Sequence, residues 1–196
     1  MAVMTPLEAR TRLAHRIAAM AMAAFLRGLK VEAVQAFGFR DDISIQGLRS
    51  PAILLQQDAS YELKEPVVME RGMLEMAALV GLARYLGVDD PFSLGVEHNK
   101  NLKIFARILE PDPGKAMRLL ERMRNEAAEI VNNNWYQITT TAKAMVKKGR
   151  VEGDALVEML AFGRTQSPTK KGPGAKAYGP DGDGLHPNSA RADFFV

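Results

Sequence analysis

The sequence predicts an α+β protein that is mainly α-helical, with a small β-sheet and an extended C-terminal tail. Apolar residues recur at helical spacing over most of residues 6–162. A β-prone stretch interrupts this pattern between residues 31 and 65. Residues 164–196 show little periodicity and hold five Gly and four Pro, so on their own they are expected to be extended. We therefore predict one domain at residues 1–163 and a tail at residues 164–196.

The composition is that of an ordinary globular protein. The 196 residues allow one well-packed domain with appendages, and 47% of them are hydrophobic and 25% charged. The absence of cysteine excludes disulfides, iron–sulfur clusters and cysteine nucleophiles. The longest uncharged apolar run near the N-terminus, residues 17–26, is well below the roughly 20 residues that cross a bilayer. We expect a cytoplasmic protein, of a cell or of an infected host, with no membrane partner.

The first element is expected to be a helix that ends near Leu26. Pro6 suits the first helical position, Thr5 suits the N-cap, and Glu8 completes a capping box. Gly28 marks the stop. The side chains expected to face the core recur at helical spacing. They are Leu13, Ile17, Met20, Ala24 and Leu29.

Three β-prone stretches follow and predict the small sheet. They are Val31–Phe39, Ile43–Leu48 and Ala52–Gln57. Two short polar segments, Asp41-Asp42 and Arg49-Ser50-Pro51, are expected to form the turns between them.

Four further helices are expected after residue 65, from the apolar period and its Gly and Pro boundaries. They are Met69–Leu86, Asn99–Leu109, Gly114–Lys148 and Gly153–Phe162. Asn99 suits the N-cap of the second. The run Asn132-Asn133-Asn134 predicts a break within the third, and Trp135 and Tyr136 beyond it are expected to anchor the core.

Three stretches together carry a resemblance to a known family. The first is HRIAAM at residues 15–20, followed by Gly28-Leu29 and a predicted strand. The second is MLEMAAL at residues 73–79, with GVEHNKNL at residues 95–102 after it. The third is AEIVNNNWYQI at residues 128–138, which runs on to KKGRVEGDAL. Over about residues 8–162, this order of elements resembles the peptidase domain of the FtsH-type zinc metallopeptidases and their stand-alone relatives.

The resemblance implies a zinc-peptidase-like helical domain, but the residues that carry zinc chemistry in the family are replaced here. Such a site needs two imidazoles one helical turn apart, a carboxylate beside the first, and a third ligand from a later helix. His15 matches the first histidine, whereas Arg16 stands at the glutamate position and Ala19 at the second histidine. The third ligand position falls on or near Asn101. A one-residue shift places Arg16 and Met20 at the histidine positions.

These replacements predict a pseudoenzyme that has no catalytic residue, metal or cofactor. A guanidinium cannot act as a general base, and it repels a divalent cation. His15 is expected to be a hydrogen-bonded, partly buried helix residue, with a weak metal pair between His15 and His98 as the alternative.

The sequence therefore predicts a non-catalytic binding or structural subunit of a larger assembly, such as a virion. Its partners are expected to be other proteins, copies of itself, or an active peptidase that it regulates. The apolar run Phe194, Phe195 and Val196 is expected to dock into a partner, the alternative being an apolar end of no consequence.

Two other functions stay open. One is a divergent zinc metallopeptidase with substituted ligands. The other is a nucleic-acid-binding accessory protein, which the net charge of +3 and the pI of about 9.2 permit but do not favour. Its basic residues would be Lys147, Lys148, Arg150 and Lys170-Lys171.

Overall fold

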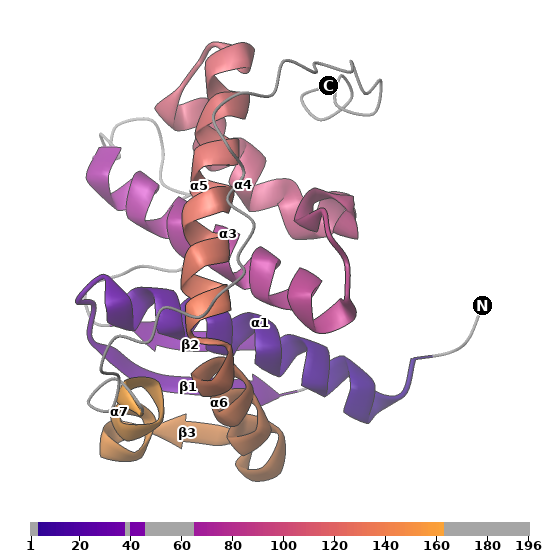
Figure 1. Ribbon diagram of the computed structural model, residues 1–196, viewed down its shortest axis with the longest axis vertical. Coiled ribbons are helices and arrows are strands. Elements are labelled where there is room, and N and C mark those ends of the chain that lie inside the picture. Colours follow the sequence, from indigo (N-terminus) through magenta and orange to yellow (C-terminus); the bar gives the residue numbers. More distant parts are fainter. Residues whose placement is uncertain (1–3, 38–39, 46–64, 163–196) are drawn as a thin grey trace, which may run out of the picture. The chain divides into compact units, whose positions relative to one another are not determined.

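The structure, a computed structural model, describes residues 4–37, 40–45 and 65–162 (Figure 1). Within these ranges it is mainly helical, with a small antiparallel sheet, which confirms the predicted α+β class. The chain divides into two units, Met1–Phe162 and Gly163–Val196. The predicted strand Ala52–Gln57 and the tail at residues 164–196 lie outside the described residues.

Helix α1 is the first element and spans Pro6–Leu26. The backbone N–H of Glu8 donates to Thr5 Oγ1 at 3.2 Å, so the predicted N-cap is confirmed. The capping box is only half formed, because the Glu8 carboxylate accepts from Arg12 at 2.8 Å instead. The helix stops where Gly28 adopts a positive φ of 77°. Its second half, residues 17–24, is buried throughout.

The sheet has three strands in the order β2-β1-β3, all antiparallel. Strands β1 (Val31–Phe37) and β2 (Arg40–Ile45) form a hairpin. The prediction of a turn at Asp41-Asp42 was wrong, because both residues pair with β1 inside β2. The pairing of Phe37 with Arg40 closes the hairpin, so the connection between the two strands precedes the predicted turn at Asp41-Asp42.

The third strand, β3 (Arg150–Glu152), was not predicted. A strand of three residues is too short to show a period in the sequence. Its partner, β1, is more than a hundred residues earlier in the chain. Val151 lies opposite Val34, and the two residues are 4% and 0% exposed. Burial of this pair, rather than any local pattern, defines the strand.

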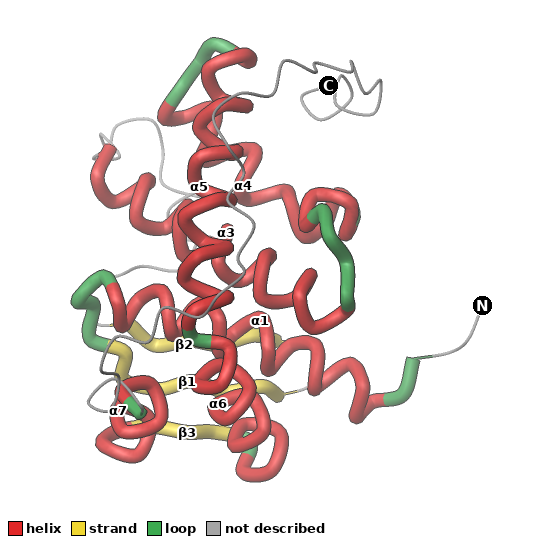
Figure 2. The backbone as a smooth tube through the Cα atoms, viewed as in Figure 1, coloured by secondary structure: helices red, strands yellow, loops and turns green. Residues whose placement is uncertain are grey.

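Helix α3 spans Glu65–Leu86 and is central to the described domain. It begins about one turn before the predicted start and ends at Gly87, as expected. Residues 71–80 are buried without interruption, which means that neighbours surround this helix on all sides. These neighbours are α1, α4 (Val96–Leu109) and α5 (Pro113–Asn133) (Figure 2).

Helix α4 corrects the predicted role of Asn99. The helix begins at Val96 after a short 3₁₀ helix, η1 (Pro91–Leu94), and its N-cap is Gly95. Asn99 therefore lies inside the first turn, 2% exposed, and its Nδ2 donates to the Phe92 carbonyl at 2.8 Å. An asparagine at a helix start caps only if its oxygen meets the free N–H groups, and this one instead holds η1 against α4.

The predicted break in the last long helical segment is confirmed at Asn134. Helix α5 ends at Asn133 and α6 (Trp135–Lys148) begins directly after the break. Asn134 is 7% exposed, and its Nδ2 donates to the Ile130 carbonyl at 2.8 Å. Helix α7 (Gly153–Ala161) follows β3, so the end of the domain returns to β1 and α6.

Candidate functional site

His15, the residue matched to the first zinc ligand, lies in an aromatic cluster. It is 6% exposed, and its ring stacks on Tyr85 with a centroid distance of 4.0 Å. The Trp135 ring also contacts the His15 ring, with a centroid distance of 5.8 Å. Nδ1 is 2.8 Å from the Thr11 carbonyl, a hydrogen bond that requires Nδ1 to carry the proton. Burial lowers the pKa of His15 and outweighs the opposing effect of the hydrogen bond that the ring donates to the Thr11 carbonyl, so the neutral imidazole is favoured.

Arg16 takes part in a buried ion-pair cluster. Its Nη2 lies 3.2 Å from Glu75 Oε2, and the other Glu75 oxygen lies 2.9 Å from Arg71 Nη2. The side chains of Glu75 and Arg71 are 5% and 7% exposed. The Glu75 carboxylate thus joins α3 to α1 through Arg16 and pairs within α3 with Arg71. The residue at the position of the family's general base is a structural cation in this chain.

Ala19, at the position of the second histidine, is the contact point of two helices. It is fully buried, and a Cβ added to Gly81 of α3 would clash with the Ala19 Cβ. The backbones of α1 and α3 therefore cross at their closest approach here. A side chain as large as imidazole has no room at this position without separating the two helices.

Asn101 is not brought together with the other three positions. It lies on α4, half-buried, and α4 packs against α3 and α5 with at most a marginal contact to α1. His98 also lies on α4, but its side chain is outside the described residues. Across residues 4–37, 40–45 and 65–162, no three His, Asp or Glu side chains gather closely enough to hold a metal ion.

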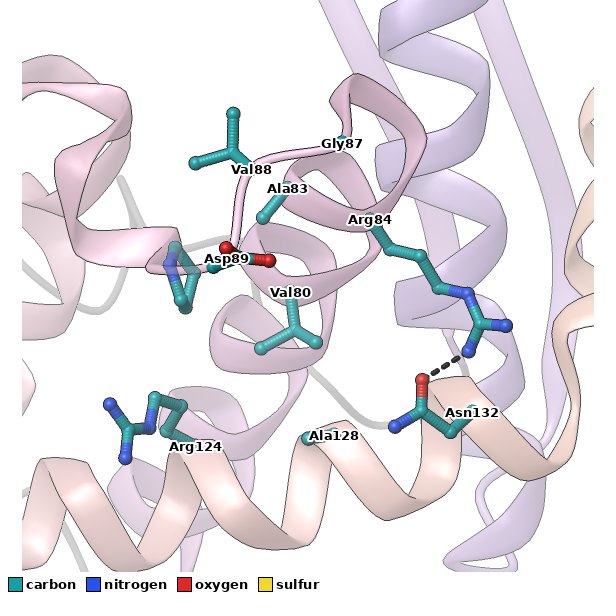
Figure 3. Close-up of a pocket in the computed structure, with 10 residues that line it drawn as sticks. Val80, Ala83, Arg84, Gly87, Val88, Asp89, Arg124, Ala128 and Asn132 are labelled. Carbon is teal, nitrogen blue, oxygen red and sulfur yellow. Dashed lines mark hydrogen bonds between the residues drawn. The ribbon is translucent and has the colours of Figure 1, made fainter. Parts of the chain in front are cut away.

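A cleft of about 400 Å³ lies between the end of α3 and the middle of α5 (Figure 3). Small apolar side chains, Val80 and Ala83 from α3 and Ala128 from α5, form part of its wall. The polar residues around them come from three elements. They are Arg84 on α3, Asp89 in the loop after it, and Arg124 and Asn132 on α5.

One end of this cleft is held by contacts that reach back to His15. Arg84 Nη1 donates to Asn132 Oδ1, as the dashed line in Figure 3 marks. The Arg84 guanidinium also lies over the Trp135 ring, 4.7 Å from its centroid, in a cation–π contact. Because Trp135 contacts His15 in turn, α1, α3, α5 and α6 together fix the position of this guanidinium.

The lining carries two positive charges and one negative charge. Within the part of the chain that the structure describes, neither Arg84 nor Arg124 forms an ion pair with a carboxylate, and Asp89 has no cationic partner. The side-chain hydrogen bonds of the two arginines go to neutral amide oxygens, from Arg84 to Asn132 and from Arg124 to Asn125 at 3.4 Å. A guanidinium without a carboxylate partner can bind an external anion with short, charge-assisted hydrogen bonds. The cleft therefore favours a ligand with negative charge.

Sequence reasoning missed this cleft. Arg84 and Arg124 lie in separate helices, and each reads as an ordinary charged residue on an amphipathic pattern. The sequence predicts Asn132 as part of a helix break and Trp135 as a core anchor, and neither role indicates a cleft. The structure shows Trp135 half-buried beneath Arg84. The expectation that Tyr136 anchors the core was wrong, because its side chain is 61% exposed.

Tyr136 instead forms an exposed aromatic pair with Phe162, whose ring centroid is 5.7 Å away. A smaller hollow of about 250 Å³ lies beside this pair, between α6 and α7. Gln137 Nε2 donates to the Phe162 carbonyl at 2.7 Å and holds the end of α7 against α6.

Fold and site together define a mainly helical α+β domain with a charged cleft between α3 and α5. No protein-family model matches the sequence, and no curated protein matches it. Among the described helices, none combines the length and the apolar character needed to cross a membrane. The predicted docking residues Phe194, Phe195 and Val196 lie outside the described residues.

Proposed function

We propose that this chain is a non-catalytic pseudo-peptidase, retained as a binding or structural subunit of a larger protein assembly. The observation that carries the proposal is the contact between Ala19 and Gly81. In a zinc peptidase of the resembled family, the position of Ala19 would present an imidazole to the metal. Here that position holds two helices together, so the helix serves packing where the family uses it for catalysis.

The surroundings of His15 and Arg16 support the same proposal. The His15 ring is covered by Tyr85, and the Arg16 guanidinium is committed to Glu75. A site that binds a divalent cation gathers anionic or neutral ligands, whereas this helix places a cation beside its one histidine. The residues of the former site thus contribute stability rather than reactivity.

The binding part of the proposal rests on the cleft between α3 and α5. A guanidinium offers several N–H donors in a fixed planar geometry and no acceptor, which suits recognition of an anionic group and not proton transfer. Phe194, Phe195 and Val196 are proposed to dock into a second partner subunit, because short aromatic segments fill apolar pockets at interfaces.

Zinc content tests the non-catalytic part. We expect the purified full chain to hold far less than one zinc per molecule by plasma mass spectrometry, and to leave fluorogenic peptides uncleaved with or without added zinc. The variant His15→Ala should give the same zinc content as the matched variant His98→Ala. Stoichiometric zinc that only His15→Ala removes, together with peptide cleavage, would establish the divergent metallopeptidase and end the proposal.

A further inference from the structure

The cleft between α3 and α5 has the dimensions of a short peptide. Arg124, Ala128 and Asn132 follow one another at four-residue spacing and line it from α5. At about 1.5 Å per helical residue, the distance along the helix axis from Arg124 to Asn132 is about 12 Å. An extended chain advances about 3.3 Å per residue, so about four residues cover this length.

The charges are distributed along that length. Figure 3 shows Arg124 at one end of the cleft and Arg84 with Asn132 at the other, with Val80 and Ala128 between them. The two guanidiniums therefore do not surround one anion. They suit a ligand that carries negative charge at both ends and small apolar groups in the middle.

We propose that this cleft binds an extended acidic peptide segment of a partner protein, about four residues long. The segment has a carboxylate near each end, which pair with Arg84 and Arg124, and small apolar side chains between them. The inference rests on the proposed binding role of the chain, and it adds the chemistry of the partner.

Asp89 and Asn132 distinguish a peptide from a nucleic acid. The Asp89 carboxylate has no cationic partner in the described part of the chain, and it can accept a hydrogen bond from a peptide N–H. Asn132 Oδ1 is used by Arg84, which leaves its amide N–H groups to donate to a peptide carbonyl. A phosphate backbone offers no donor to Asp89, and the carboxylate would repel it.

The only tryptophan of the chain provides a reporter at this site. Trp135 lies directly under Arg84, so an anion that binds the guanidinium changes the environment of the indole ring. The probe is acetyl-Glu-Ala-Val-Glu-amide, titrated into the full chain while Trp135 fluorescence is recorded. The matched neutral probe is acetyl-Gln-Ala-Val-Gln-amide.

We expect saturable binding of the acidic peptide and no saturation with the neutral one. Arg124→Gln should weaken the acidic peptide about tenfold, the usual effect of losing one charge-assisted hydrogen bond. Arg122→Gln removes the same charge from an exposed position of α5 that does not line the cleft, and it should leave the affinity unchanged. Raised salt should weaken binding.

Three results would overturn the inference: equal binding of the two peptides, equal effects of Arg124→Gln and Arg122→Gln, or tighter binding of an oligothymidylate than of the acidic peptide. These outcomes are separate from the zinc measurement. A zinc-free, non-hydrolytic protein that ignores the acidic peptide contradicts only the inference. A protein that binds the peptide and cleaves it with zinc contradicts the proposed function.

Discussion

At the scale of residues, His15 and Arg16 are neighbours on α1, and each avoids the cost of an unpaired buried charge in a different way. His15 avoids the cost of a buried charge by staying neutral, with its Nδ1 proton donated to Thr11. Arg16 cannot lose its proton, so it is paired with Glu75, which also pairs with Arg71. Removing Glu75 would take a carboxylate partner from two guanidiniums at once, one on α1 and one on α3.

The state of His15 predicts how stability depends on pH. Burial lowers its pKa in the folded protein below the value of 6.5 that the unfolded chain has, so the unfolded state binds the proton more tightly. The free energy of unfolding should therefore fall as the pH drops below 6.5, until the pH passes the lowered pKa of the folded state. Urea denaturation at a series of pH values on both sides of 6.5 measures this slope.

The variant His15→Phe isolates the contribution of this one group. Phenylalanine keeps a ring against Tyr85 but does not titrate, so the slope between 6.5 and the lowered pKa should be shallower than in the natural chain. The remaining slope then belongs to the other histidines and to carboxylates. Identical slopes in the two proteins would show that His15 has the same pKa folded and unfolded.

At the scale of elements, α3 is held by close helix crossings and by ion pairs in its first half. Arg27, just after α1, forms two hydrogen bonds to Glu70 of α3, at 2.5 and 3.0 Å, and one to Glu126 of α5 at 2.7 Å. The hydrogen bonds to Glu70 raise the pKa of Arg27 above its ordinary value. Half-exposed ion pairs contribute little each, about 1 kcal/mol or less, so the crossings carry most of the stability.

The two buried glycines of α3, Gly72 and Gly81, predict responses of different size to an added methyl group. In Gly81→Ala the new Cβ meets the Ala19 Cβ at the crossing with α1, and overpacking of this kind costs about 1–3 kcal/mol. Alanine regains about 1 kcal/mol of helix propensity. We expect a net loss of up to about 2 kcal/mol in the free energy of unfolding, measured by urea denaturation.

Gly72→Ala is the matched control on the same helix. Its Cβ would lie 2.7 Å from the Cε of Met123, the free end of a flexible side chain that can move aside. Its stability should change by less than that of Gly81→Ala, and the double variant Ala19→Gly with Gly81→Ala should recover part of the loss. If Gly81→Ala is as stable as the natural chain, the crossing is looser than described and Ala19 no longer argues against a ligand there.

At the scale of the whole molecule, the chain divides at Phe162 and Gly163. The core of the first unit is made by its own helices and sheet, so we expect a chain that lacks residues 164–196 to keep its helical circular dichroism and a cooperative thermal transition. We also expect the truncated chain to lose assembly with its partners, measured by light scattering of co-purified complexes.

The full-length double variant Phe194→Ala with Phe195→Ala tests whether these two side chains, rather than the length of the tail, are needed for docking. These two changes should weaken assembly as truncation does while leaving the melting temperature unchanged. Unfolding of the truncated chain would show that the tail belongs to the domain. Normal assembly of the double variant would assign the docking to other residues.

Helices were the part of the fold that could be predicted. Thr5, Gly28, Gly87 and Gly149 punctuate a clear apolar period, and α1, α3 and α7 begin or end close to the predicted residues. The error at Asn99 arose because one side chain can satisfy either of two hydrogen-bonding patterns. Asn99 satisfies the N-cap pattern yet binds the Phe92 carbonyl, a partner that no local rule identifies.

The sequence by itself determined the mainly helical class, the order of the long helices, and the presence of Arg16 and Ala19, rather than ligand side chains, beside His15. These depend on local periodicity and on the chemistry of single side chains. The tertiary structure alone decided that Ala19 meets Gly81, that β3 joins β1, and that Arg84 and Arg124 line one cleft. Each of these joins residues far apart in the chain, and such contacts depend on how buried surfaces fit, which no local pattern encodes.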